Sequence, residues 1–174
     1  MIYIVRHGQT DWNKEGRYQG KIDIELNELG VNQAETLRDK LENIDFDIVF
    51  SSTLKRAYKT AQIITNKKII IDDRLSERGN GILEGKLKSE IKEVIDFNGS
   101  MASQYKIEDI NDFKNRIKSF LDEIMVKYKN KNILIVTHAG VSIYIRCYFE
   151  GEPMDGDYSK YKLKNCEVIQ YSND

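Results

Sequence analysis

The sequence predicts an α/β protein: a three-layer sandwich with a mostly parallel central sheet, helices on both faces and a single domain. Three observations lead to this fold class. Short apolar runs of strand length alternate with segments whose apolar residues recur at helical spacing. A chain of 174 residues can bury one sizeable core. The chain has one proline and no tract rich in serine and glycine, so no long linker is expected.

The first half of the chain is expected to contain three strands and two helices. Residues 2–5 are apolar and predict a buried strand, which a polar loop at 9–23 follows. Asn27 can cap a helix that extends to about Ile44, because an asparagine side chain accepts hydrogen bonds from the first free N–H groups. The remaining elements of this half are a strand at 47–52, a helix at 53–65 and a strand at 68–72.

The second half begins with a glycine-containing loop at 73–87 and a short helix at 88–96. A long helix at about 109–129 follows, since apolar residues mark one of its faces. These residues are Ile110, Phe113, Ile117, Phe120, Ile124 and Tyr128. The last expected elements are a strand at 132–137, a helix at about 141–149 and short strands near 158–163 and 166–171.

The balance of charge excludes some kinds of partner. With a net charge of −1 the chain offers no strong field for nucleic acid or an anionic membrane. No apolar run is long enough to span a bilayer and no signal peptide is recognisable, so we expect a cytoplasmic protein with no membrane partner. No pattern indicates an oligomeric state.

The cysteines and histidines do not form a metal-binding pattern. Cys147 and Cys166 are too far apart for a CxxC pair, and only two histidines are present. We expect two reduced thiols, no metal and no cofactor.

Both histidines of the chain lie where a predicted strand ends. His7 follows the strand at 2–5, and His138 follows the strand at 132–137. Ligands of open parallel sheets bind at the carboxyl ends of the strands. Either histidine alone is more often structural, but two at the same edge favour chemistry, in which imidazole serves as nucleophile, acid or base.

Two arginines are expected near the same edge and suggest a phosphate ligand. Arg6 precedes His7, and Arg56 lies in the first turn of the helix after the second strand. A guanidinium group matches phosphate geometry, and helix N-termini attract anions. Transfer of a phosphoryl group also needs an acid for the leaving alcohol. From spacing alone, Glu77 and Glu84 are equal candidates.

Five stretches of the sequence, in order, resemble motifs of one family. Together they cover nearly the whole chain and are highly specific. The family is the histidine phosphatase superfamily, also called the phosphoglycerate mutase-like family, and the nearest branch is that of bacterial phosphatases and α-ribazole phosphatases. The matching stretches are "RHGQTDWN" (6–13), "RYQGKIDIELNELG" (17–30), "SSTLKRAYKTA" (51–61), "LSERGNGILEG" (75–85) and "VTHAGV" (136–141).

The resemblance implies a reaction. His7 matches the nucleophile that becomes phosphohistidine, and Glu77, rather than Glu84, matches the proton donor. The family needs no metal. A phosphomonoester hydrolase acting on a small phosphorylated metabolite is therefore expected.

The resemblance also assigns the residues that hold the phosphate. Arg6, Arg56 and His138 match groups that bind the phosphoryl group and stabilise its transition state. Asn13 and Gln19 match positions that line the phosphate pocket.

Three positions depart from the family pattern. Glu25 stands where proline is common, and Thr53 where proline or aspartate is common. Residues 107–109 replace a Gly-Glu-Ser sequence before the long helix. Neither of the first two changes removes a catalytic group, and the third leaves open what the start of the long helix contributes to the pocket.

Two alternatives to a phosphatase remain. One is a cofactor-dependent phosphoglycerate mutase, which Arg78 would favour if it held a carboxylate of the substrate instead of pairing at the surface. A mutase must protect phosphohistidine from water, and the short segment at 86–108 would protect it poorly. The other is a non-catalytic module that binds a phosphorylated ligand. The retained His7, Glu77 and His138 argue against it.

The chain is expected to form one histidine phosphatase domain over 1–174. The residues that select the substrate are expected in a short cap near 86–108 and in a tail loop at 150–165. Both segments carry lysines and tyrosines that could contact an anionic or ring-bearing substrate; solvated lysines and packed tyrosines are an equally good interpretation. These residues are Lys86, Lys88, Lys92 and Tyr105 in the cap and Tyr158, Lys160, Tyr161 and Lys162 in the tail.

Overall fold

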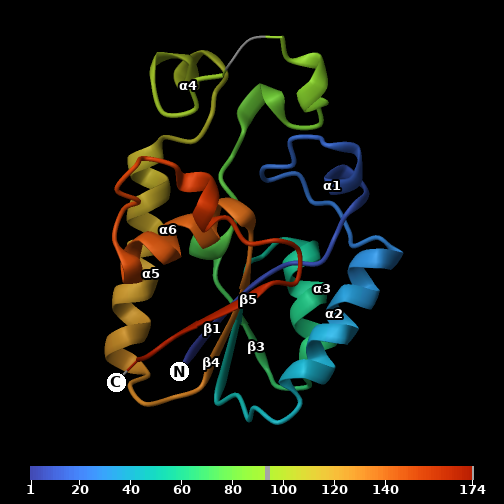
Figure 1. Cartoon of the computed structure of the whole chain (residues 1–174), viewed down its shortest axis with the longest axis vertical. Coiled ribbons are helices and arrows are strands. Elements are labelled where there is room, and N and C mark those ends of the chain that lie inside the picture. The colour runs from blue at the N-terminus through green and yellow to red at the C-terminus, as the bar shows by residue number, and fades with distance from the viewer. Residues whose placement is uncertain (93–94, 174) are drawn as a thin grey trace.

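A central β-sheet organises the computed structural model, which describes residues 1–92 and 95–173 (Figure 1). Within these residues the sheet has five strands in the order β3-β2-β4-β1-β5. Four are parallel, and the edge strand β5 runs antiparallel to β1. The strands are β1 (Ile2–Arg6), β2 (Ile48–Ser51), β3 (Ile69–Ile71), β4 (Ile133–Thr137) and β5 (Val168–Tyr171). The sheet confirms the predicted α/β fold class.

Helices cover both faces of the sheet, as the sequence predicts (Figure 1). On one face, α2 (Glu28–Leu41) and α3 (Lys55–Ile64) pack against alternate strand residues such as Val49 and Val136. On the other face, α5 (Ile110–Lys127) and α6 (Ala139–Glu150) pack against residues such as Ile4 and Ile135. Successive strand residues point to opposite faces, so strands buried on both sides read as continuous apolar runs.

The long helices have ends that the sequence largely explains. The side chain of Asn27 accepts a hydrogen bond from Gly30 N at 2.9 Å and caps α2 as expected. This helix ends at Leu41, three residues before the predicted Ile44. Helix α6 begins at Ala139, directly after His138, two residues earlier than predicted. The histidine therefore joins a buried strand to a helix without an intervening loop.

Short elements account for most of the wrong predictions. The predicted loop at 9–23 contains a five-residue helix, α1 (Asp11–Glu15), which buries no side chain and so leaves no apolar pattern. Thr10 and Asn13 exchange side-chain to backbone hydrogen bonds at its start and stabilise it. The predicted strand at 158–163 is wrong: residues Tyr158–Tyr161 form a 3-10 turn, capped by the side chain of Asp157.

The segment before α5 also differs from the prediction. The helix predicted at 88–96 is replaced by a 3-10 turn at Lys88–Glu90, and residues 93–94 lie outside the described part. A one-turn helix, α4 (Ser100–Gln104), lies further along. The predicted loop at 73–87 contains two further 3-10 turns, at Asp73–Leu75 and Gly81–Leu83. Together with α1, these segments lie beyond the carboxyl ends of the parallel strands (Figure 1).

None of the helices in the described ranges is both long and apolar enough to cross a membrane.

Candidate active site

The two histidines lie side by side because their strands are neighbours in register. Arg6 of β1 pairs with Thr137 of β4, and the next residue of each strand is a histidine. The N–H of His7 donates to the carbonyl oxygen of Thr137 at 2.9 Å. The centroids of the His7 and His138 rings are 5.1 Å apart. The structure thus brings both histidines to one edge of the sheet.

His7 is a buried, neutral imidazole. Its Nδ1 lies 2.7 Å from the carbonyl oxygen of Gly8, which can only accept, so Nδ1 carries the proton and Nε2 keeps a lone pair. Burial, followed by the positive charges of Arg56 and Arg6, holds the pKa of His7 well below its usual 6.5. A neutral imidazole with a free Nε2 is a competent nucleophile.

Arg56 is completely buried at the start of α3. Its Nη1 donates to the carbonyl oxygen of Ile22 at 2.8 Å and its Nη2 to that of Gly20 at 2.7 Å. Burial lowers the pKa of Arg56 to about 10, which leaves the group charged at neutral pH. Within the described part of the chain no carboxylate forms an ion pair with it. An anionic ligand could supply the missing negative charge.

Four buried side-chain polar atoms have no hydrogen-bond partner among the described residues, and all four belong to residues singled out from the sequence. Buried polar atoms without a partner are rare in folded proteins, and a bound ligand is one explanation. The four atoms are Arg6 Nε, Gln19 Oε1, Arg56 Nε and His138 Nδ1.

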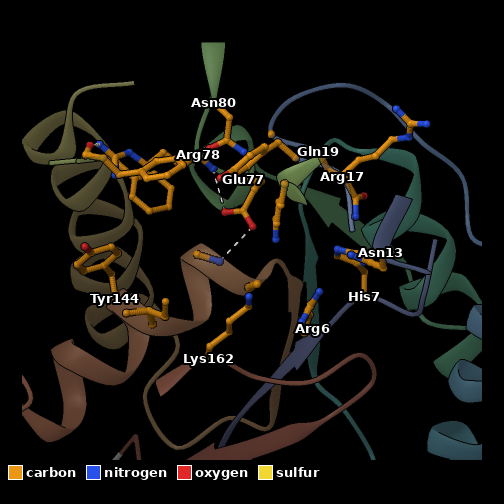
Figure 2. Close-up of a pocket in the computed structure, with 18 of the residues that line it drawn as sticks. Arg6, His7, Asn13, Arg17, Gln19, Glu77, Arg78, Asn80, Tyr144 and Lys162 are labelled. Atoms are coloured by element: carbon orange, nitrogen blue, oxygen red, sulfur yellow. Dashed lines mark hydrogen bonds between the residues drawn. The ribbon is translucent and has the colours of Figure 1, made fainter. Parts of the chain in front are cut away.

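Glu77 faces His7 across the cavity (Figure 2). Its Oε1 accepts a hydrogen bond from Arg78 N at 2.9 Å, and its Oε2 accepts one from Gly140 N at 3.0 Å. Glu84 is not among the lining residues, and its Oε1 accepts instead from the N–H groups of Lys21 and Asn80. Of the two glutamates left open by sequence spacing, only Glu77 is positioned to meet a ligand beside His7.

Asn13 and Gln19 also line the cavity. Asn165, which the sequence analysis missed, holds two parts of the site together. Its Nδ2 lies 2.9 Å from the carbonyl oxygen of His7 and 3.2 Å from Asn13 Oδ1. No sequence signal marks Asn165, because it stands in a polar loop about 150 residues after the groups that it contacts.

His138 is placed differently from the other expected residues. It is fully buried, does not line the cavity and lies beside His7. Its Nε2 is 2.8 Å from Ser52 Oγ. Burial and the neighbouring Arg56, His7 and Arg6 hold its pKa well below 6.5. Any contact with a phosphoryl group would have to come from Nδ1, which has no partner among the described residues.

The cavity has a volume of about 420 Å³, enough for a small metabolite. Its described lining holds six basic side chains and one carboxylate, that of Glu77. Sequence reasoning missed Arg17, Asn80 and Tyr144 as lining residues. The six basic residues are Arg6, Arg17, Arg56, Arg78, Lys88 and Lys162. Such a lining favours an anion.

Nothing in the described side chains resembles a metal site: no three His, Cys, Asp or Glu residues come together to hold an ion. The two cysteines, Cys147 and Cys166, are free thiols. Burial raises the pKa of Cys147 to about 11 and that of Cys166 to about 12, so both are protonated at neutral pH.

A cationic cavity with a neutral histidine at the edge of a parallel sheet and a facing carboxyl group defines a phosphate-handling site. The family model of the histidine phosphatase superfamily (branch 1) matches residues 2–173. The chain belongs to this family.

Individual relatives agree with this assignment. Phosphoserine phosphatase 1 of Hydrogenobacter thermophilus is 33% identical over 98% of this chain and 84% of its own length. Among solved structures, the phosphoserine phosphatase of Entamoeba histolytica in complex with 3-phosphoglyceric acid has a TM-score of 0.79 and 28% identity, over 96% of this chain and 87% of that one. A putative α-ribazole-5′-P phosphatase of Escherichia coli has a TM-score of 0.76 and 25% identity, over 94% of this chain and 85% of that one.

Proposed function

We propose that this protein is a metal-independent phosphomonoester hydrolase that acts through a phosphohistidine intermediate on His7. The observation that carries the proposal is the position of His7. A neutral imidazole with a free Nε2 lies opposite a carboxyl group and beside two arginines that form no ion pair with any described residue. Phosphoryl transfer needs mainly positioning and positive charge, and this site supplies both.

The reaction follows from these positions in two steps. First, Nε2 of His7 attacks phosphorus, a P–N bond forms and the P–O ester bond breaks. Glu77 gives its proton to the leaving alcohol, while Arg6 and Arg56 stabilise the charge on the phosphoryl oxygens. Second, Glu77 takes a proton from a water molecule that attacks phosphorus. The P–N bond breaks, and inorganic phosphate leaves with His7 neutral again.

The contacts of Arg78 favour hydrolysis over the mutase alternative. Its Nε donates to Glu108 O at 2.9 Å, its Nη1 to Asn98 Oδ1 at 2.9 Å and its Nη2 to Phe97 O at 2.8 Å. A guanidinium that anchors the chain at 97–108 is poorly placed to capture a substrate carboxylate as well. The non-catalytic alternative is disfavoured because His7 and Glu77 line the same cavity.

The substrate that we propose is a small phosphomonoester with a second anionic group, such as a carboxylate. The excess of basic side chains around the cavity supports this. Arg17 pairs with Glu15, and one phosphoryl group does not neutralise the other five cations. Relatives named phosphoserine phosphatase are in keeping with it. We further propose that residues 86–108 act as the specificity cap of a domain spanning 1–174. A cytoplasmic location, where the cysteines stay reduced, and the absence of a nucleic-acid partner complete the proposal.

The test is release of phosphate by purified wild type and by His7→Ala, with p-nitrophenyl phosphate and O-phosphoserine as substrates. We expect wild type to hydrolyse at least one of them and His7→Ala to lose activity at least a thousandfold. Wild type mixed rapidly with substrate should form an acid-labile, base-stable phosphoryl adduct that is absent from His7→Ala. Equal activity of the two proteins, or no hydrolysis of any phosphomonoester by wild type, would contradict the proposal.

Control variants separate chemistry from folding. Glu84→Gln should retain activity, because the Glu84 carboxyl group lies outside the cavity lining. Glu77→Gln should lower kcat/KM by roughly 10²–10⁴ for substrates with alkyl leaving groups, which is the usual value of general acid catalysis.

A further inference from the structure

The carboxyl group of Glu77 is held by main-chain N–H groups from two different parts of the chain. Arg78 N donates to Oε1 from the residue directly after Glu77, and Gly140 N donates to Oε2 from the first turn of α6 (Figure 2). Each carboxyl oxygen therefore has one fixed donor. A carboxyl group held at both oxygens has little freedom to rotate, which fixes the direction in which its proton can be transferred.

Gly140 also leaves room for the side chain of Glu77. A Cβ atom added at residue 140 would lie 2.5 Å from Glu77 Oε1 and 3.3 Å from its Cδ. The next atom, Phe113 Cζ, would be 3.5 Å away, at an ordinary contact distance. The carboxyl group of Glu77 thus occupies the volume that a side chain at residue 140 would need.

The backbone of Gly140 does not require glycine. Residue 140 lies in a regular helix and is not among the residues with positive φ. Glycine in a helix is normally less favourable than alanine. Glycine is therefore explained by the Glu77 carboxyl group, which occupies the space that a side chain at residue 140 would need.

We propose that Gly140 is a positioning residue for the proton donor: its N–H orients the Glu77 carboxyl group, and its missing side chain gives that group room beside the cavity. This inference rests on the proposed function, in which Glu77 protonates the leaving alcohol. A methyl group at residue 140 would displace the end of the Glu77 side chain at the expense of its two hydrogen bonds, while the helix backbone stays in place.

The displacement should affect only reactions that need the proton. Breaking the ester bond of an alkyl phosphate requires protonation of the leaving oxygen, whereas p-nitrophenolate leaves readily without it. The value of kcat/KM reports the steps up to formation of phosphohistidine, and so excludes the later attack of water. The ratio of kcat/KM for the two substrates therefore measures proton donation separately from phosphate binding.

The experiment compares Gly140→Ala with wild type on O-phosphoserine and p-nitrophenyl phosphate. We expect kcat/KM to fall at least tenfold for O-phosphoserine and to change less than twofold for p-nitrophenyl phosphate. The melting temperature should be unchanged or higher, because alanine is the better helix former. A clear fall in melting temperature would overturn the proposal, since it would show that the helix gives way instead of Glu77.

A double-mutant cycle tests whether Gly140 acts through Glu77. In the Glu77→Gln background, which leaves no proton to donate, adding Gly140→Ala should cost less than twofold in kcat/KM on O-phosphoserine. An equal loss on both substrates, no loss on either, or the full loss in the Glu77→Gln background would overturn the inference. Inactivity of wild type on every phosphomonoester would instead contradict the proposed function, so the two failures are distinguishable.

Discussion

Arg56 donates a hydrogen bond at 2.7 Å to the carbonyl oxygen of Gly20, a neutral acceptor, although the guanidinium is fully buried. The loop that contains Gly20 thus orients the guanidinium group of Arg56 without neutralising its charge. Removing a charge from water is costly unless an opposite charge compensates it. The arrangement therefore favours binding of an anion beside Arg56.

Phosphate should therefore stabilise the fold through Arg56. We expect inorganic phosphate to raise the melting temperature of wild type, by an amount equivalent to about 2.7 kcal/mol at one hundred times its Kd. Arg56→Lys should lose most of this stabilisation, and its kcat should fall by about 10²–10³. The ammonium group of lysine cannot replace the planar set of N–H donors of the guanidinium group. Thermal denaturation in phosphate and in sodium chloride of equal ionic strength checks this. An equal effect of both salts would contradict it.

The buried histidines should make stability sensitive to mild acid. The pKa of His7 is well below 6.5 in the folded protein and close to 6.5 when unfolded. At pH values between these two pKa values, the unfolded state binds more protons than the folded state. The free energy of unfolding that neutral His7 contributes is therefore complete above pH 6.5 and falls as the pH decreases. The slope reaches about 1.4 kcal/mol per pH unit for each such group.

Urea denaturation of wild type and His7→Gln at several pH values between 7.5 and 5.5 measures this effect. As the pH decreases, the free energy of unfolding should fall less steeply in His7→Gln than in wild type. The two slopes should differ by up to about 1.4 kcal/mol per pH unit. Comparison with the variant cancels contributions from the carboxylates. Parallel curves for the two proteins would show that His7 is not held neutral by the fold.

Arg78 should hold in place the segment at 97–108, of which Phe97 and Asn98 line the cavity. Arg78→Met removes donors to Phe97 O, Asn98 Oδ1 and Glu108 O, and a hydrogen bond from a charged group contributes about 1.5–3 kcal/mol. We expect kcat/KM to fall about tenfold or more, mainly through KM, and amide exchange to quicken near residues 97–108. Arg74→Met is the matched control: Arg74 pairs with Asp72 and Glu123 and does not line the cavity. A similar effect of both variants would refute a special role for Arg78.

Lys162 should recognise the second anionic group of the substrate. Its side chain points toward the cavity (Figure 2), and among the described residues it forms no ion pair. Burial and the nearby charges of Lys88 and Arg6 lower the pKa of Lys162, so a carboxylate there would relieve the repulsion.

Two substrates that differ only in a carboxylate test this role. Lys162→Met should reduce kcat/KM several-fold for O-phosphoserine and leave it unchanged for O-phosphoethanolamine. Lys160→Met should affect neither, because Lys160 pairs with Asp155 outside the cavity. If Lys162→Met lowers both values equally, the lysine contributes only general attraction for phosphate.

Much of the fold could be predicted because its signals are local and repetitive. The strands at Ile2–Arg6 and Ile133–Thr137 are buried on both faces and stand out as apolar runs. Helix α5 buries Phe113, Ile117 and further residues of one face, which its spacing makes visible. The rule that ligands bind at the carboxyl ends of parallel strands also predicts that His7 and His138 lie at the same edge of the sheet.

The remaining parts depend on contacts that leave no local pattern. The turn at Tyr158–Tyr161 has the composition of a strand, but it is stabilised by the Asp157 side chain and does not pair with the sheet. Glu77 faces the cavity and Glu84 does not, and the spacing of the two glutamates in the sequence does not show this difference. Asn165 reaches His7 only through the tertiary fold. The same holds for Arg17 and Tyr144 in the cavity lining.

The position of β1 has a consequence for how the protein is made. The strand that precedes His7 is synthesised well before both strands that pair with it, because β4 and β5 lie beyond residue 132. Until that part of the chain has left the ribosome, Ile2 and Ile4 have no sheet to join, and His7 remains exposed to solvent. The arrangement of His7 beside His138 therefore forms only once β4 has been made, and a nascent chain that stalls earlier carries His7 without the site around it.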